Sequence, residues 1–203
     1  MKIGIFGGSF DPIHLGHLIL AEQCREQAKL DQVLFVPNAQ NPLKPDGASA
    51  TDRQRCEMIE FAIAGHEEFY LSKVEIERGG TSYTVDTLQE IAEKQPDDEL
   101  FFLMGGDSLD SFGQWHQPEQ ILKLASPLIV NRPGADPIDL SKLAAYTEPD
   151  RLNSFKKLLS KSPMIEISSS NLRQRIGAGQ SSRYQLPRSV EKFIETQKLY
   201  TSK

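Results

Sequence analysis

Hydrophobic residues along the chain fall into short runs that are separated by longer, mostly polar stretches. Branched and aromatic residues are concentrated in runs whose length is typical of buried strands. We predict six strands, at residues 3–6, 32–36, 69–74, 99–104, 127–131 and 164–167. Between them, apolar residues three or four positions apart predict helices at residues 17–29, 51–64, 84–94, 118–124, 168–176 and 187–197, with two weaker short helices near 140–145 and 154–159.

The order of these elements predicts the fold. A strand, a helix and a second strand occupy the first 36 residues, and the crossover of such a βαβ unit makes its two strands parallel. Since strands and helices continue to alternate, we predict an α/β fold: a doubly wound, mainly parallel, Rossmann-like sheet with helices on both faces. The length of 203 residues suits one core, so we expect a single domain, 1–203, in which the helical part at about 168–200 packs on that core.

Composition and charge exclude some classes of function. The chain has 23 basic and 28 acidic residues, a net charge of -5, so we expect no broad positive surface and no nucleic-acid partner. No apolar run approaches the ~18 residues that a membrane-spanning helix requires, which predicts no membrane association and a cytoplasmic protein. Cys24 and Cys56 lie in helical patterns without Cys-x-x-Cys spacing, and we interpret them as buried, reduced thiols.

The strongest chemical signal lies in KIGIFGGSFDPIHLGH, residues 2–17. A short apolar strand ends at Gly7 and Gly8, and the turn that follows opens a helix. Glycine is used where the backbone needs a positive φ or must let a ligand approach, and unpaired amides at a helix start bind anions. His14 and His17 are three residues apart, so both can face the bound group. The stretch therefore predicts a phosphate cradle with two histidines.

Polar or glycine-rich segments follow nearly every predicted strand, and they would cluster at one edge of the sheet. The sequence shows neither a Ser-His-Asp order nor a metal-binding cluster. Cationic groups around an anion cradle, without an evident nucleophile, favour phosphoryl or nucleotidyl transfer, in which positioning and charge stabilisation do most of the catalysis. The cationic or hydrogen-bonding groups of these segments are His14, His17, Lys44, Arg132 and Arg173, and their carboxylates are Asp11 and Asp107.

Several segments resemble one family of enzymes. Residues 7–17 carry without a gap the adenylyltransferase pattern Gly-Gly-(Ser/Thr)-Phe-Asp-Pro-x-His-x-Gly-His, and their glycine spacing fits neither the dinucleotide fingerprint nor the P-loop. The likeness continues in residues 82–88 (SYTVDTL), 105–109 (GGDSL) with Trp115 beyond, 132–134 (RPG), 167–173 (ISSSNLR) and the final Leu199-Tyr200. Together these segments are similar to the bacterial nicotinate-nucleotide adenylyltransferases, which join nicotinate mononucleotide to the AMP part of ATP in NAD biosynthesis.

The resemblance implies a reaction and a role for each matching residue. The phosphate of nicotinate mononucleotide would attack the α-phosphorus of ATP in line and expel pyrophosphate, with Mg²⁺ carried by ATP and no protein side chain assigned to a metal. The implied catalytic residues are His14 and His17, which would donate to phosphate oxygens, and Lys44 and Arg173, which would hold the β- and γ-phosphates. The implied ATP-binding residues are Gly7, Gly8, Ser9, Phe10, Gly16, Gly105, Asp107, Ser168, Ser169 and Ser170.

A second set of residues is implied for the acceptor, nicotinate mononucleotide. The pyridine ring would lie against Trp115, and the backbone around Tyr83 and Thr84 would fix its carboxylate, with Asn38 nearby. Arg132 would reach the acceptor phosphate or ribose. The resemblance thus divides the site into an ATP side and an acceptor side.

Three positions depart from the family pattern. Leu43 stands where histidine is usual, so any role of that histidine is absent here. Ser170 replaces a threonine and keeps the hydroxyl group. His116 follows the tryptophan where a second aromatic residue is common, which changes the expected wall of the pyridine pocket. None of these departures concerns the histidine pair.

The residues also allow less specific interpretations. His14 and His17 could cap a helix or bind a metal, Lys44 and Arg132 could be surface charges, and Trp115 could belong to the core. A nucleotide-sensing module without turnover is a second hypothesis, and transfer to nicotinamide mononucleotide or phosphopantetheine is a third. The choice between nicotinate and nicotinamide depends on one carboxylate and on backbone geometry, so residue types leave it open, as they leave the oligomeric state.

Overall fold

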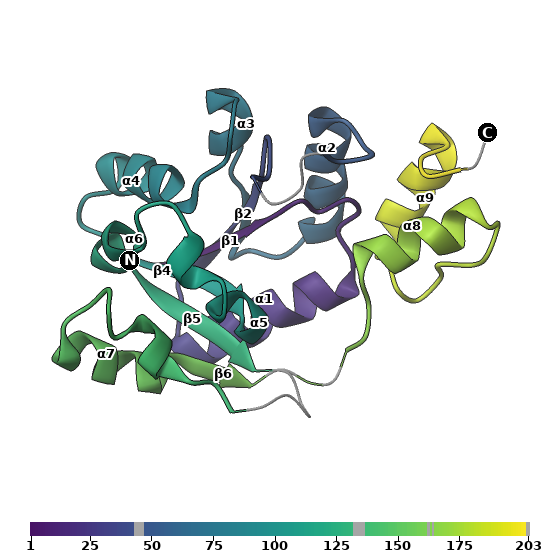
Figure 1. Ribbon diagram of the computed structural model, residues 1–203. Helices are drawn as coiled ribbons and strands as arrows, with labels where there is room; N and C mark the ends of the chain where they lie inside the picture. Colours follow the sequence, from purple (N-terminus) through teal and green to yellow (C-terminus); the bar gives the residue numbers. More distant parts are fainter. Residues whose placement is uncertain (43–46, 132–136, 162, 164, 202–203) are drawn as a thin grey trace.

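The computed structural model describes residues 1–42, 47–131, 137–161, 163 and 165–201. Within these residues the strands form one sheet in the order β3-β2-β1-β4-β5-β6, and every neighbouring pair is parallel (Figure 1). The strand order reverses between β1 and β4, at the centre of the sheet, which is where open α/β sheets bind ligands. The strands are β1 (Lys2–Gly8), β2 (Gln32–Pro37), β3 (Phe69–Leu71), β4 (Glu99–Gly105), β5 (Ala125–Asn131) and β6 (Leu159–Lys161).

Helices cover both faces of this sheet, as Figure 1 shows. The α-helices are α1 (Leu15–Ala28), α2 (Asp52–Ile63), α3 (Val74–Arg78), α4 (Thr84–Lys94), α5 (Gly106–Leu109), α6 (Pro118–Leu124), α7 (Pro149–Phe155), α8 (Ser169–Gly177) and α9 (Arg188–Gln197). Short 3₁₀ helices lie at η1 (Phe112–Gln114), η2 (Leu140–Leu143) and η3 (Lys156–Leu158). This architecture confirms the predicted doubly wound, parallel α/β fold.

Alternation along the strands divides the core into two layers. Val33 and Phe35 of β2 belong to a buried cluster that includes apolar residues of α1, α2, α8 and α9. Val36, on the same strand, belongs to a second cluster with residues of α4, α6 and α7. Successive residues of a strand point to opposite faces, so a strand that is apolar throughout supplies both layers.

Two strand predictions need correction. The last strand is β6 at Leu159–Lys161, where Leu159 pairs with Ile129 of β5, whereas residues 165–167 of the predicted strand have no regular structure. Pro163, just before that apolar run, cannot donate to a strand ladder. The third strand ends at Leu71 instead of residue 74, because Val74 begins α3 and buries its side chain in the second layer.

The C-terminal helices lie beside α2 at one end of the molecule (Figure 1). Val190 and Ile194 of α9 and Leu172 of α8 belong to the same buried cluster as Val33 of β2. The Ser189 hydroxyl donates to the Phe61 carbonyl at 2.9 Å. This segment therefore shares a buried layer with the sheet.

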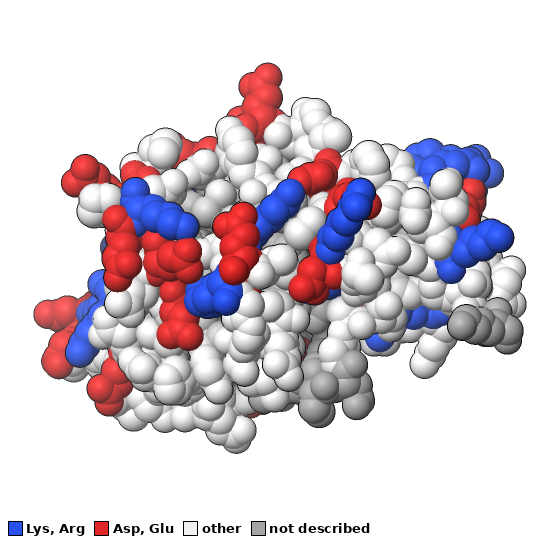
Figure 2. Space-filling model, turned by 90° about the horizontal axis from the view of Figure 1, so that it is seen from above, with Lys and Arg blue, Asp and Glu red and all other residues white. Residues whose placement is uncertain are grey.

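The surface carries both signs of charge. Figure 2 shows acidic and basic side chains interspersed over the face seen from above, with several pairs side by side. Ion pairs such as Arg53–Glu57 at 2.9 Å and Arg25–Glu22 at 2.7 Å join neighbouring turns of helices. Among the described helices, none combines the length and apolar composition that crossing a membrane requires. Cys24 and Cys56 are buried free thiols, as predicted.

Candidate active site

A cavity of about 710 Å³ lies at the carboxyl ends of the central strands. Every predicted site residue that the structure describes lines it. Those residues are Gly7, Gly8, Ser9, Phe10, His14, Gly16, His17, Asn38, Tyr83, Thr84, Gly105, Asp107, Trp115, Ser168, Ser169, Ser170 and Arg173. Lys44 and Arg132 lie outside the described residues, as does Leu43. The fold thus brings together segments that are far apart in the sequence, and the roles of their residues stay predictions.

The turn after β1 shows what its glycines do. Gly7 and Gly8 continue the strand, and the positive φ of the turn, 47°, belongs to Phe10. A Cβ added at Gly8 would lie 3.1 Å from the Phe10 ring, whereas a Cβ at Gly7 would meet no atom within 4 Å. The first glycine therefore leaves open space at the cavity wall, and the second makes room for a buried phenylalanine. A positive φ accounts for neither glycine, and close packing against Phe10 accounts for Gly8 alone.

His14 and His17 begin helix α1. His14 is the residue before the first helical position, and its ring stacks on the ring of His17 with the centroids 3.7 Å apart. The His14 backbone N–H donates to Nδ1 of His17 at 3.2 Å, so a neutral His17 carries its proton on Nε2. Nδ1 of His14 is buried without a hydrogen-bond partner. The pair thus lies side by side at the cavity with hydrogen-bonding capacity unused by the protein.

Burial decides the charge of this pair. It lowers the pKa of His14 to about 4. It also holds the pKa of His17 well below the ordinary value, with a smaller contribution from the nearby His14. Both rings are therefore neutral at pH 7, and each can still donate one N–H to a phosphate oxygen. The free protein therefore presents two neutral imidazoles at the cavity, not two cations.

Helix α8 places the Arg173 guanidinium and its own N-terminus beside the turn that follows β1. The Arg173 guanidinium donates to the Asp11 carbonyl at 2.6 Å and lies 3.4 Å from the Ser170 hydroxyl. The Ser169 hydroxyl donates to the Pro12 carbonyl at 2.9 Å. Ser168 caps the helix by accepting from the Asn171 amide at 3.2 Å. These contacts place the free amides of the helix start and a positive charge beside the histidine pair.

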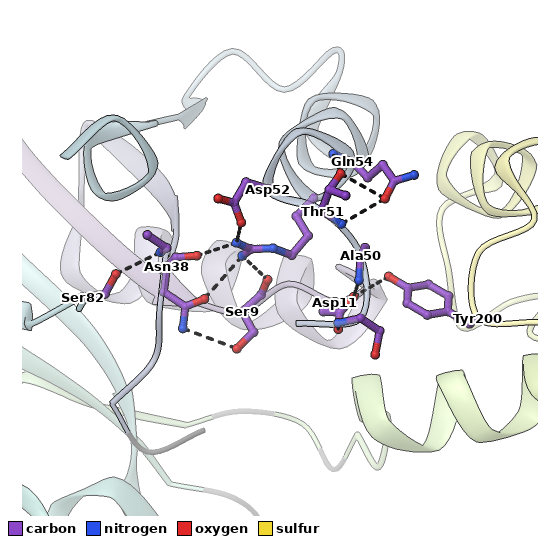
Figure 3. Close-up of polar contacts among 12 residues, drawn as sticks. Ser9, Asp11, Asn38, Ala50, Thr51, Asp52, Gln54, Ser82 and Tyr200 are labelled. Carbon is purple, nitrogen blue, oxygen red and sulfur yellow. Dashed lines mark hydrogen bonds and ion pairs between the residues drawn. The ribbon is translucent and has the colours of Figure 1, made fainter. Parts of the chain in front are cut away.

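Asp11 fixes the turn between the histidines and β1. Its carboxylate accepts hydrogen bonds from the amides of Ser49 and Ala50, at 2.7 and 3.0 Å, and from the Tyr200 hydroxyl at 2.7 Å (Figure 3). Only 3% of Asp11 is exposed. Burial is the largest cause of a raised pKa at Tyr200, and the Asp11 carboxylate adds to it. The Asp11 carboxylate thus has a structural role: it links the turn after β1 to the residues before α2 and to the C-terminal segment.

The opposite wall of the cavity is formed by the segment before α4. Gly79 and Gly80 have φ angles of 68° and 69°, which only glycine adopts readily, and they turn the chain toward the cavity. Ser82 then joins this segment to the loop after β2: its hydroxyl accepts from the Ala39 amide, and its own amide donates to the Gln40 carbonyl, both at 2.9 Å. The two loops therefore form one surface.

Aromatic rings line the part of the cavity that is predicted to hold the acceptor. Trp115 is half-buried, and its ring packs against Phe112 with the centroids 5.3 Å apart. Tyr83 packs against His116 at 4.6 Å. His116 thus provides a flat ring at the position where the resemblance leads one to expect a second aromatic residue. The rings of Tyr83, Trp115 and His116 thus give the cavity one aromatic wall, with Phe112 packed behind Trp115.

A carboxylate, that of Asp107, also lines the cavity. Asp107 stands in the short helix α5, directly after β4, and lines the cavity. A Cβ added at Gly105 would collide with Oδ1 of Asp107, so this carboxylate folds back over a glycine. The described part of the chain contains no group of three or more His, Cys, Asp or Glu side chains that could hold a metal ion.

Comparisons with known proteins identify the family. A family model described as cytidylyltransferase-like matches residues 5–175. A probable nicotinate-nucleotide adenylyltransferase of Rhodopirellula baltica is 40% identical over 198 residues, which cover 98% of this chain and 92% of that protein. A similarly named protein of Bacillus pumilus is 37% identical, with 99% of both chains covered. The chain belongs to the nicotinate-nucleotide adenylyltransferase family.

Solved structures of adenylyltransferases share the fold. A Plasmodium falciparum nicotinic acid mononucleotide adenylyltransferase, complexed with NaAD, superposes with a TM-score of 0.76 at 19% identity, covering 98% of this chain and 97% of that one. A putative nicotinate-nucleotide adenylyltransferase of Vibrio parahaemolyticus superposes with a TM-score of 0.69 at 21% identity, covering 100% and 96%. The fold of this family member is therefore that of known adenylyltransferase structures.

Two buried charged residues beside the site of this family member escaped sequence analysis. Arg55 of α2 is completely buried, and its guanidinium contacts Ser9 and Asn38. Glu75 of α3 lines the cavity, accepts from the Thr87 hydroxyl at 2.6 Å, and has its pKa raised by burial. For Arg55, the sequence held one signal of burial. It lies four residues before Ile59, and this spacing puts it on the apolar face of its helix.

Proposed function

We propose that this chain transfers the AMP group of ATP to nicotinate mononucleotide. A phosphate oxygen of the acceptor forms a bond to the α-phosphorus, the bond from that phosphorus to the bridging oxygen breaks, and pyrophosphate leaves. The products are nicotinate adenine dinucleotide and pyrophosphate, as in NAD biosynthesis. The observation that carries the proposal is a single cavity with a histidine pair, a helix start and Arg173 on one side and Ser82 and the aromatic wall on the other. The named relatives support the same substrates.

On the ATP side, the proposed roles follow from the donors around the turn after β1. Nε2–H of His17 donates to an oxygen of the α- or β-phosphate, and His14 donates beside it. Arg173 and the first amides of α8 hold the β- and γ-phosphates, and Lys44 joins them from the loop after β2. Such donors stabilise the charge that develops as the bond to pyrophosphate breaks.

Mg²⁺ arrives as the complex with ATP in this proposal. Phosphate oxygens are the hard ligands that Mg²⁺ prefers, and the ion usually keeps several waters in such sites. In this proposal Asp107, which lines the cavity, accepts from one of those waters or from a ribose hydroxyl. When bound, the ion offsets the negative charge of the phosphates.

On the acceptor side, the pyridine ring lies against Trp115, and the backbone amides around Tyr83 and Thr84 hold its carboxylate. Asn38 completes this side, and Arg132 reaches the acceptor phosphate or ribose. Backbone amides are neutral donors that favour an anionic group, so they favour nicotinate over nicotinamide. Transfer to nicotinamide mononucleotide shares all of the phosphate chemistry and is the competing substrate to test.

A steady-state assay tests the proposal. Purified protein receives ATP and Mg²⁺ with nicotinate mononucleotide, nicotinamide mononucleotide or phosphopantetheine, and chromatography follows pyrophosphate and the adenylylated product. We expect kcat/KM for nicotinate mononucleotide to exceed that for nicotinamide mononucleotide at least ~10-fold, the value of about 1.4 kcal/mol of selective binding. Equal use of both would contradict the carboxylate contact. ATP binding without product from any acceptor would instead support the nucleotide-sensing module.

A further inference from the structure

Arg55 is a buried cation to which the proposed function assigns no role. It lies near the start of α2, and none of its side chain is exposed. It is therefore screened from any bound substrate and cannot act by direct contact. Besides Asp52, its hydrogen-bond partners are Ser9, which follows β1, and Asn38, which follows β2; Figure 3 labels these partners. These are the two loops to which the ATP side and the acceptor side belong.

The guanidinium spans both loops at once. Nη1 donates to the Ser9 carbonyl at 2.8 Å and approaches Oδ1 of Asn38 at 3.4 Å. Nη2 donates to the Asn38 carbonyl at 2.5 Å and to Oδ1 of Asp52 at 2.6 Å. Nδ2 of the Asn38 side chain lies 3.5 Å from the Ser9 hydroxyl. The backbone N–H of Asn38 donates to the Gly8 carbonyl at 3.0 Å. The rigid fork of one side chain thus fixes the spacing of two loop backbones.

Pairing with a carboxylate does not by itself explain why the Arg55 guanidinium is buried at this place. Burying a cation is expensive unless it is paired, and well-packed apolar residues often replace buried ion pairs without loss of stability. The carboxylate that pairs with Arg55, on Asp52, is itself about half exposed, at 51%. The remaining partners are two carbonyl groups and an amide oxygen, all of which belong to the loops that line the cavity.

We propose that Arg55 is a positioning residue for the transfer reaction. By holding the Ser9 and Asn38 backbones at a fixed distance, it sets the alignment between the α-phosphorus of ATP and the attacking phosphate of the acceptor. This inference rests on the proposed function. In-line displacement depends on that alignment, and a misplacement of about 1 Å costs on the order of 10²-fold in rate. The groups that contact each substrate are all retained when Arg55 is replaced, so the binding of either substrate alone changes less.

The test compares three variants of the full-length protein. Arg55→Met removes the guanidinium and keeps a similar length, and Arg55→Lys keeps the charge but offers one nitrogen where two are needed. Ile59→Val, in the same helix and also completely buried, is the matched control for a general loss of stability. For each variant kcat and both KM values are measured, together with Tm, below the onset of unfolding.

We expect Arg55→Met to lower kcat on the order of 10²-fold while each KM changes less than about threefold. Arg55→Lys should recover only part of the loss, and Ile59→Val should lower Tm but keep the wild-type kcat. A folded Arg55→Met variant with kcat within about twofold of wild type overturns the inference. If Arg55→Met fails to fold, Arg55→Lys decides in the same way. Failure of the wild-type protein to form the dinucleotide would refute the proposed function instead.

Discussion

At the residue scale, burial gives the histidine pair its chemical state. Both rings are neutral before a ligand arrives, and the hydrogen bond from the His14 amide to Nδ1 of His17 directs the proton of His17 to Nε2. The sequence predicted that the two side chains lie together, because a separation of three residues is local to one helical turn. It left open whether they are cationic, since that depends on residues packed around them from distant segments.

His17→Ala removes one of the proposed donors to the phosphates. We expect kcat to fall on the order of 10²-fold, because the donor acts on charge that develops in the transition state. His66→Ala is the matched control: this histidine pairs with Glu22 at 2.9 Å and lies away from the site. Steady-state kinetics with ATP and nicotinate mononucleotide measure both variants. A loss of less than threefold would contradict the role of His17.

Burial of His14 also predicts a pH dependence of stability. Its pKa is about 4 in the folded protein and about 6.5 in the unfolded chain. Between these values the unfolded chain binds the proton and the folded protein does not, so the free energy of unfolding falls as the pH is lowered. Each such group contributes a slope of about 1.4 kcal/mol per pH unit. The lowered pKa of His17 acts in the same direction.

Urea unfolding between pH 7 and pH 4.5 measures that slope. Wild type and His14→Asn both lose stability as carboxylates become protonated, so the difference between the two proteins isolates the contribution of His14. We expect the decline of His14→Asn to be shallower by about 1.4 kcal/mol per pH unit below pH 6. Parallel curves would show that His14 is not held neutral by burial.

At the scale of the elements, local signals predicted most of the sheet and its helices. Apolar runs located the first five strands, and the serines at residues 168–170 predicted the start of α8. The errors concern short segments: β6 and α3 have three and five residues, too few to show a period. Their structure depends on neighbours, since β6 is defined by pairing with β5. Contacts between loops, such as those of Ser82, leave no trace in a single sequence.

Ser82→Ala tests the junction of the two acceptor loops. Loss of the hydroxyl leaves the Ala39 amide without its partner, at a cost of about 1–3 kcal/mol, and loosens the backbone at Tyr83. We expect KM for nicotinate mononucleotide to rise about tenfold while KM for ATP stays within twofold. Ser154→Ala, which removes an exposed hydroxyl of α7, should change neither value. Equal increases in both KM values would show that Ser82 does not act on the acceptor side.

At the scale of the whole molecule, the C-terminal segment contacts the predicted phosphate cradle at the turn after β1. Arg173, Ser169 and Tyr200 contact Asp11 or Pro12, and the Gln185 carbonyl accepts from the Leu15 amide at 3.0 Å. We propose that the chain therefore unfolds as one cooperative unit. The sequence indicated a functional serine-rich segment near residue 170 but could not show these partners, because they are up to 189 residues away.

Tyr200→Phe removes the hydrogen bond to the buried Asp11 carboxylate. We expect the free energy of unfolding to fall by about 1.5–3 kcal/mol, the range for a lost hydrogen bond to a carboxylate, with a single transition by circular dichroism and fluorescence. Tyr184→Phe is the control, because 80% of Tyr184 is exposed. Two separate transitions would contradict cooperative unfolding, and an unchanged midpoint would contradict the contribution of the hydrogen bond.

The hydrogen bond between Asp11 and Tyr200 also has a consequence for the synthesis of the protein. The chain emerges from the ribosome N-terminus first, so the cradle turn is exposed long before its last partner exists. At roughly 5–20 residues per second, the separation of 189 residues corresponds to a delay of about 10–40 s. During that interval a nascent chain has the histidines but not the segment that holds their turn. The turn is therefore complete only after Tyr200 has been synthesised, and a product that terminates before Tyr200 lacks this hydrogen bond.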